Sequence, residues 1–198
     1  SILLSFQSTH PHGVRRMYSA LNIPAATTNS YFGASLTNYT YGDVMGGDAN
    51  KGSTAADQSD FTLLETFSFT TDNSYIKRKW VAVYDAVARA NNVMHLAGLI
   101  KDELSAIPGQ EKDFYTEAIA QARFMRGFYL FEGIKNFGAA IPYVSLEDYE
   151  SSVNPLISNV DESGNYIYIW EQVAEDLQYA YDNPVSYTHL RAHETSLH

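Results

Sequence analysis

The chain of 198 residues contains no cysteine, which excludes a disulfide framework and any thiolate metal site. It is also poor in basic residues, because 13 Lys and Arg stand against 23 Asp and Glu. The resulting formal net charge of −10 makes nucleic acid an unsuitable partner, since phosphate binding requires a basic surface. No apolar run reaches the roughly 18 residues that a membrane-spanning helix requires, so no segment is predicted to cross a bilayer.

Signatures of catalysis are missing as well. There is no Gly-x-Ser-x-Gly elbow, and without cysteine there is no thiol nucleophile. The acidic pairs Glu147/Asp148, Asp161/Glu162 and Glu175/Asp176 are adjacent in sequence, whereas glycoside hydrolysis needs two carboxyl groups facing each other across a cleft. We therefore interpret these pairs as solvated charge, and we predict no catalytic residue, no cofactor and no enzyme activity.

The histidines do not indicate a metal site. His189 and His193 are four residues apart, as two ligands on one helix would be, but Leu190 stands where the zincin pattern requires Glu. His95 falls late in a predicted helix, where a contact with the C-terminal end of the helix dipole is the simpler interpretation. The sequence thus predicts no bound metal.

What the sequence does contain is helical periodicity. Hydrophobic residues make up 45% of the chain, which is typical of a globular protein. Apolar residues recur at steps of three and four in three segments, which predicts helices over 74–97, 111–137 and about 168–181. We expect the first two helices to form an antiparallel pair whose interior includes Trp80, Tyr84, Val87, Ala122, Met125 and Tyr129.

The remaining segments read as irregular structure. Residues 22–73 are rich in Gly, Ser, Thr, Asn, Asp and Tyr and are predicted to be mainly loop with short ordered pieces. Residues 139–166 are predicted to be extended, with a turn at 161–165. Arg123 and Arg126 lie in the second helix, and we expect them to form an ion pair or helix-terminus contact with a neighbouring helix.

Four features in order carry a family resemblance. They are the helix WVAVYDAVARANN, the helix EAIAQARFMRGFYLFEGIKNFG, the Ile-Pro step at 141–142, and the helix IYIWEQVAEDLQYAYDNP. This order resembles the SusD/RagB family of outer-membrane lipoproteins that capture glycans. The resemblance implies an all-α fold of SusD-like, tetratricopeptide-type helical repeats with long irregular loops.

The resemblance also implies a function. Proteins of this family bind oligosaccharides at the cell surface and work with a TonB-dependent outer-membrane transporter in nutrient uptake. They are attached to the outer membrane through a lipid anchor, which this chain does not contain. Residues 1–184 would then be the N-terminal part of a SusD-like domain, and residues 185–198 would be a non-native tail, since SYTHLRAHET resembles translated vector sequence.

A glycine-rich segment at 42–52 is the most promising candidate site. It lacks the Gly-Lys-Ser/Thr of a phosphate loop and the Gly and Glu positions of an EF-hand, so it is either a surface turn or a ligand loop. Sugar rings stack their C–H faces on aromatic side chains, and their hydroxyl groups bind Asn and Asp. The candidate carbohydrate-binding residues are therefore Tyr31, Tyr39, Tyr41, Asp48 and Asn50.

Two other functions remain open. A helical-repeat scaffold that binds a protein partner would have the same periodicity, and an α-helical enzyme acting on glycans would have a similar surface. A lipoprotein signal and a neighbouring transporter gene would favour the glycan-binding protein over the scaffold. Glycan binding without product release would favour it over the enzyme.

Overall fold

Helices dominate the computed structural model of the chain, which describes residues 39–105, 114–152 and 155–184. The predicted all-α fold is confirmed, because the β pairing within the described residues is limited to an isolated bridge between Val160 and Tyr166. Tyr31 and the predicted tail at 185–198 lie outside the described residues, so the boundary at 184 stays a prediction. The chain divides into two compact units, one comprising residues 18–85 and the other residues 1–17 and 86–198.

The described part of the first unit is built around a small aromatic core. It contains the π-helix η1 (Tyr39–Val44), helix α2 (Ser59–Glu65) and the first half of helix α3 (Ser74–Leu99). The buried residues of this core are Val44, Phe61, Leu64 and Tyr75. Six half-buried side chains pack against them, namely Tyr39, Tyr41, Met45, Ala49, Phe69 and Ile76. The segment predicted as mainly loop therefore has a core of its own.

Helix α3 begins where the sequence offers a cap. The Oδ1 atom of Asn73 accepts a hydrogen bond from the backbone N–H of Tyr75 at 3.0 Å. The Asn73 amide also donates to the carbonyl of Asp60 at 2.8 Å, which ties this helix start to α2. Since uncapped N–H groups at a helix start are otherwise unsatisfied, Asn73 fixes the first residue of α3.

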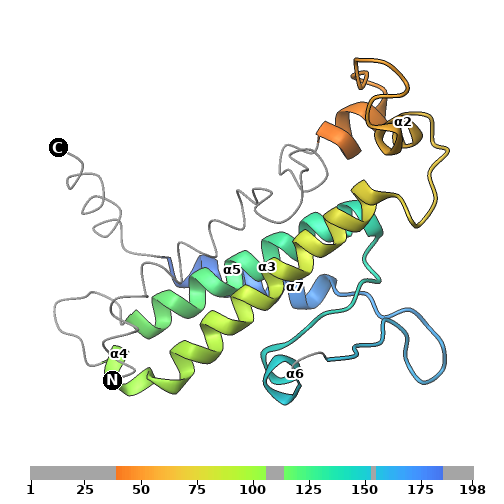
Figure 1. Ribbon diagram of the computed structural model, residues 1–198. Coiled ribbons are helices and arrows are strands. Elements are labelled where there is room, and N and C mark those ends of the chain that lie inside the picture. Colours follow the sequence, from red (N-terminus) through yellow and green to blue (C-terminus); the bar gives the residue numbers. More distant parts are fainter. Residues whose placement is uncertain (1–38, 106–113, 153–154, 185–198) are drawn as a thin grey trace, which may run out of the picture. The chain divides into compact units, whose positions relative to one another are not determined.

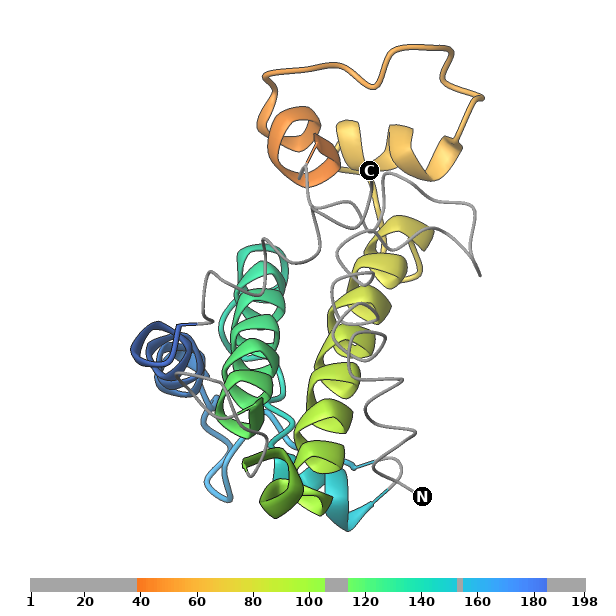
Figure 2. The ribbon, with the colours of Figure 1, turned by 90° about the vertical axis from the view of Figure 1, so that its left-hand side faces the viewer.

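The second unit is a layer of helices. It contains residues 86–99 of α3, α4 (Lys101–Ser105), α5 (Phe114–Phe137), α6 (Leu146–Ser151) and α7 (Trp170–Asp182). Ala97 of α3 packs with Ala118 of α5, and Asn91 contacts Arg126, so α3 and α5 run antiparallel as predicted. Figures 1 and 2 show α5 between this part of α3 and α7.

Helix α5 is buried on most of its circumference. Its buried residues fall on every side of the helix and are Glu117, Ala118, Ala120, Ala122, Met125, Arg126, Gly127, Tyr129, Leu130, Glu132, Gly133 and Ile134. Gly127 faces α7 so closely that an added Cβ would lie 3.1 Å from Leu177 and 3.2 Å from the Cβ of Asp176. A helix covered on several faces has no single apolar stripe, which is the expected pattern for a central helix.

The chain between α5 and α7 is less extended than predicted. The predicted turn at 161–165 is confirmed, since Gly164 donates to the Asp161 carbonyl and has a φ of 81°. The short helix α6 was not predicted. It begins with a capping box in which the Ser145 side chain accepts from the Asp148 N–H and the Asp148 side chain accepts from the Ser145 N–H.

Of the six residues predicted to be in the interior, four are buried, Tyr84 is half buried and Trp80 is exposed. Val87, Ala122, Met125 and Tyr129 are buried. Trp80, however, is 38% exposed, and its ring packs against that of Tyr84, with 4.7 Å between the ring centroids. A helical stripe marks one side of a helix, but it does not show how far the covering structure extends along that side.

Candidate functional site

The glycine-rich segment forms an ordered loop between η1 and α2. Gly47 and Gly52 have φ angles of 85° and 72°, a region that side chains other than glycine rarely adopt. Asp48 and Ala49 both donate their backbone N–H to the carbonyl of Asp43, at 2.9 and 3.0 Å. The two glycines thus allow the chain to reverse, and the hydrogen bonds to Asp43 hold the turn.

Tyr39 helps to hold this loop. Its hydroxyl donates to the backbone carbonyl of Asn50 at 2.9 Å, and its ring meets the edge of Phe61 with 6.0 Å between centroids. The side chain is half buried in the aromatic core of the first unit. Tyr39 thus links the candidate loop to the aromatic core of the first unit.

Tyr41 is packed in the same core. The ammonium of Lys79 lies 5.9 Å from its ring centroid, an arrangement of the cation–π kind. Burial raises the pKa of Tyr41, with the neighbouring Tyr75 acting in the same direction. The ring of Tyr41, predicted as a stacking surface, is therefore half buried between η1 and α3.

Asp48 and Asn50 are the exposed members of the predicted set. Their backbones are anchored, and no hydrogen bond to either side chain is made within the described part of the chain. A carboxylate and an amide with open hydrogen-bonding capacity suit a ligand rich in hydroxyl groups. The structure thus places Asp48 and Asn50 in one loop, joins Tyr39 of η1 to that loop through the Asn50 carbonyl, and packs Tyr41 in the same core as Tyr39.

Exposed aromatics occur elsewhere than predicted. Trp80 and Tyr84 form a partly exposed pair on α3 in the first unit. In the second unit, Tyr166, Tyr168 and Trp170 are each more than half exposed where the chain enters α7. Any of these rings has the apolar face that sugar stacking requires. The sequence predicts Trp80 in the interior because aromatics at helical spacing usually pack there.

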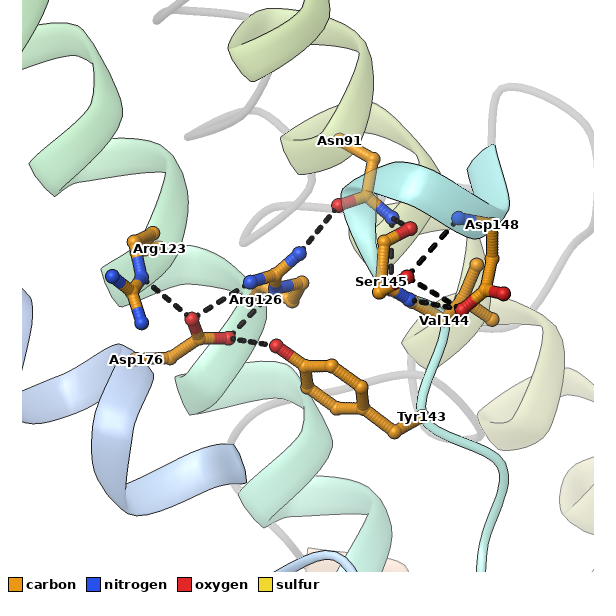
Figure 3. A network of polar contacts seen from close by, with 8 residues as sticks. All are labelled: Asn91, Arg123, Arg126, Tyr143, Val144, Ser145, Asp148 and Asp176. Atoms are coloured by element: carbon orange, nitrogen blue, oxygen red, sulfur yellow. Dashed lines mark hydrogen bonds and ion pairs between the residues drawn. The ribbon is translucent and has the colours of Figure 1, made fainter. Parts of the chain in front are cut away.

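The most connected polar cluster of the second unit surrounds Asp176 (Figure 3). Its carboxylate is fully buried and accepts hydrogen bonds from Arg126 Nε at 2.6 Å and Nη2 at 2.8 Å. Arg123 Nε donates to the same carboxylate at 2.8 Å, and the hydroxyl of Tyr143 donates at 3.2 Å. The predicted ion pair of Arg123 and Arg126 with a neighbouring helix is confirmed, whereas the interpretation of Asp176 as solvated charge is wrong.

The charges of this cluster influence one another. Burial alone would lower the pKa of Arg126, but the hydrogen bonds and negative charge of Asp176 outweigh burial and raise it. Burial raises the pKa of Tyr143 to about 12, although the Arg126 cation acts against this. Arg123 also lies over the ring of Tyr179, 4.5 Å from its centroid. Two cations and one anion therefore lie close together, stabilised by carboxylate, hydroxyl and aromatic contacts.

Asn91 connects this cluster to helix α3. Arg126 Nη1 donates to Asn91 Oδ1 at 2.8 Å, and the Asn91 amide donates to the carbonyl of Val144 at 3.0 Å (Figure 3). Asn91 thereby positions the chain immediately before the capping box of Ser145. Because these groups are buried and already satisfy one another, the cluster holds α3, α5 and α7 together.

Other charged groups that the structure describes lie apart from this cluster, as His95 shows. His95 lies on the surface, with its Nδ1 atom 2.8 Å from Oε1 of Glu150 on α6. Among the residues that the structure describes, no group of three or more His, Asp and Glu side chains could hold a metal ion. Within the same residues, no helix combines the length and apolar character needed to cross a bilayer.

Comparison with known proteins gives one relevant match. Over 117 residues the chain is 28% identical to SusD-like protein P2 of Formosa agariphila. The aligned region is 59% of this chain and 21% of the relative, so the chain spans about a fifth of the length of the curated relative it matches. No protein-family model and no solved structure matches the chain. The similarity agrees with the resemblance seen in the order of the helices.

Proposed function

We propose that this chain is the N-terminal part of a cell-surface protein of the SusD type that binds oligosaccharides without transforming them. The observation that carries this proposal is the similarity to SusD-like protein P2 over 117 residues. The all-α architecture of the described residues supports it. An ordered loop that displays Asp48 and Asn50 supplies chemistry suited to hydroxyl groups.

Asp48 and Asn50 would accept and donate hydrogen bonds to sugar hydroxyls, while an exposed aromatic ring would stack on the apolar face of a sugar. Trp80 and Phe67 are the candidates in the first unit, since they are 38% and 65% exposed, and the ring of Trp80 is held by that of Tyr84. Tyr39 and Tyr41 would contribute by supporting the loop and its core. Binding would be weak in this chain alone if residues beyond it complete the site.

The transport part of the proposal follows from the family resemblance. The bound oligosaccharide would be passed to a TonB-dependent transporter in the outer membrane, where a lipid anchor would hold the complete protein. Reading the source locus through both ends tests this directly. We expect a lipoprotein signal with its acylated cysteine upstream and a transporter gene beside it, and a locus with neither would contradict the surface assignment.

Binding and the absence of catalysis need separate measurements. Isothermal titration of the complete protein against host and plant oligosaccharides should give saturable binding of at least one glycan. Chromatography of the same glycans after incubation should show no new products. Hydrolysis that disappears when Asp or Glu residues are replaced would favour the enzyme alternative, and binding of protein partners without any glycan would favour the scaffold.

A further inference from the structure

Lys51 lies at the centre of the candidate loop and has an unusual set of neighbours. Its ammonium donates to the carbonyl of Thr54 at 2.8 Å, to the hydroxyl of Thr62 at 2.7 Å and to the carbonyl of Asp57. An ammonium group has three N–H donors, so these acceptors use all of them. The three oxygens come from the loop and from α2, which means that one side chain joins both.

The acceptors resemble the shell of a bound cation. Carbonyl and hydroxyl oxygens are ligands that hard cations such as Ca²⁺ take in protein loops. Here the positive charge among them belongs to the side chain of Lys51. Asp48 and Asn50 have an Asp-x-Asn spacing that also suits a cation, but both side chains are exposed, and the positive charge next to the loop backbone is that of Lys51.

The backbone on either side of this ammonium is also held. Asp48 and Ala49 donate to the Asp43 carbonyl, and the Asn50 carbonyl accepts from Tyr39. The backbone N–H of Lys51 donates to Oε1 of Glu65 at 2.9 Å. Each residue from 48 to 51 thus has a backbone hydrogen bond, and only the side chains of Asp48 and Asn50 extend into solvent.

We propose that Lys51 is a positioning residue that acts as an internal cation, holding the 47–52 loop in the conformation that presents Asp48 and Asn50 to a hydroxyl-rich ligand. The ligand part of this inference rests on the proposed function. A loop that is already ordered loses less conformational entropy when it binds, so the anchoring increases affinity without contact between Lys51 and the ligand. Because the ammonium supplies the charge, the loop is ordered without a divalent ion.

Hydrogen exchange of the 198-residue chain tests the anchoring. Lys51→Met keeps the length of the side chain and removes the charge and all three donors. We expect about tenfold faster exchange at the amides of Asp48, Ala49 and Lys51, since the loop opens more often once the three hydrogen bonds to the ammonium are lost. Lys77→Met is the matched control, because Lys77 is an exposed lysine of the same unit. Equal exchange in wild type and Lys51→Met would overturn the proposal.

Divalent ions give a second test of the same claim. Exchange at residues 48–51 of the wild-type chain should be the same with Ca²⁺ and with EDTA. Protection that appears only with Ca²⁺ would show that a metal ion orders the loop, and would contradict the role of Lys51 as the internal cation.

The ligand part is tested by a double-mutant cycle on a glycan that the complete protein binds. Lys51→Met and Asn50→Ala should each weaken binding, and the double variant should weaken it by less than the product of the two, although their side chains do not touch. If the two substitutions weaken glycan binding independently, Lys51 does not position Asn50 for the ligand, even if Lys51→Met loosens the loop. If wild type binds no glycan, the proposed function and the ligand part fail together, while the exchange experiment still decides whether Lys51 orders the loop.

Discussion

Each unit has a basic residue that stabilises it from within, Lys51 in the first and Arg126 in the second, and the two act in different ways. Arg126 is buried and pairs with a buried carboxylate, whereas Lys51 is half exposed and its ammonium donates only to neutral carbonyl and hydroxyl oxygens. A buried charge needs an opposite charge because water no longer solvates it. A half-exposed ammonium keeps part of its hydration, so neutral acceptors are sufficient. The comparison predicts that removing the charge partner of Arg126 destabilises the whole second unit. Removing the ammonium of Lys51 should loosen only the 47–52 loop.

Replacing Asp176 by Ala should have the largest effect. The change leaves Arg123 and Arg126 without their anion, and breaking a buried pair in this way costs about 3–5 kcal/mol. Urea denaturation followed by circular dichroism would measure the loss. Glu175→Gln is the control, because Glu175 is the exposed neighbour on the same helix and should change stability little. If both variants lose a similar amount of unfolding free energy, the buried ion pair of Asp176 does not stabilise the unit more than an exposed acidic residue does.

Gly127→Ala should have the next largest effect. The added methyl group would lie 3.1 Å from Leu177 and push α7 away from α5, at a cost of about 1–3 kcal/mol. Gly98→Ala provides a control of opposite sign, since nothing lies within 4 Å of its added Cβ and alanine favours a helix. Thermal denaturation should show a lower midpoint for the first variant and an equal or higher one for the second.

Tyr143→Phe tests the pH dependence of the same cluster. Burial raises the pKa of Tyr143 to about 12 in the folded chain, against about 10 in an unfolded chain. The contribution of this hydroxyl to stability should therefore be complete below pH about 10 and should be lost as the pH rises toward about 12. Stability curves across this range should converge for wild type and Tyr143→Phe. Parallel curves would show that Tyr143 does not titrate within the cluster.

Tyr39→Phe should have the smallest effect, and a local one. It removes the hydrogen bond to the Asn50 carbonyl but keeps the ring against Phe61, which costs about 1 kcal/mol. Exchange at residues 48–51 should rise, while exchange in α5 and α7 should not change. A cooperative loss of stability throughout the chain would contradict the comparison between the two units.

Apolar periodicity was sufficient to predict the three long helices, although α5 is buried on several faces and not along a single stripe. Helix α3 begins at Ser74 as predicted, directly after Asn73, whose side chain caps it. Helix α6 was missed, although Ser145 and Asp148 have the spacing of a capping box. Six residues are too few for a periodic signal, so only the cap could have revealed this helix.

The polar cluster was predicted in part. Arg123 and Arg126 could be assigned to an interhelical ion pair, but their partner could not be identified from local sequence. Asp176 lies three residues after Val173, so it occupies the buried side of α7, and that position was the available signal. Adjacent Glu175 is exposed, which shows why neighbouring acidic residues cannot be interpreted as one group.

The candidate loop was located correctly as an irregular glycine-rich segment, but its support was not foreseen. The contact from Lys51 to Thr62 spans 11 residues, and the contact from its backbone to Glu65 spans 14. Such contacts depend on how the loop folds back on α2, and the composition of the loop does not predict that fold. Whether Tyr31, Tyr39, Tyr41, Asp48 and Asn50 bind carbohydrate stays a prediction.

The distance along the chain between Arg126 and Asp176 has a consequence for biosynthesis. Arg126 follows Asn91 by 35 residues and precedes Asp176 by 50. At roughly 5–20 residues per second, roughly 2.5–10 seconds separate the synthesis of Arg126 from that of its carboxylate. During this interval α3 and α5 can pair through Asn91 while the guanidinium is still hydrated. The arrival of α7 then removes that water, so ribosome pausing before Asp176 should prolong the life of a half-assembled, chaperone-accessible hairpin.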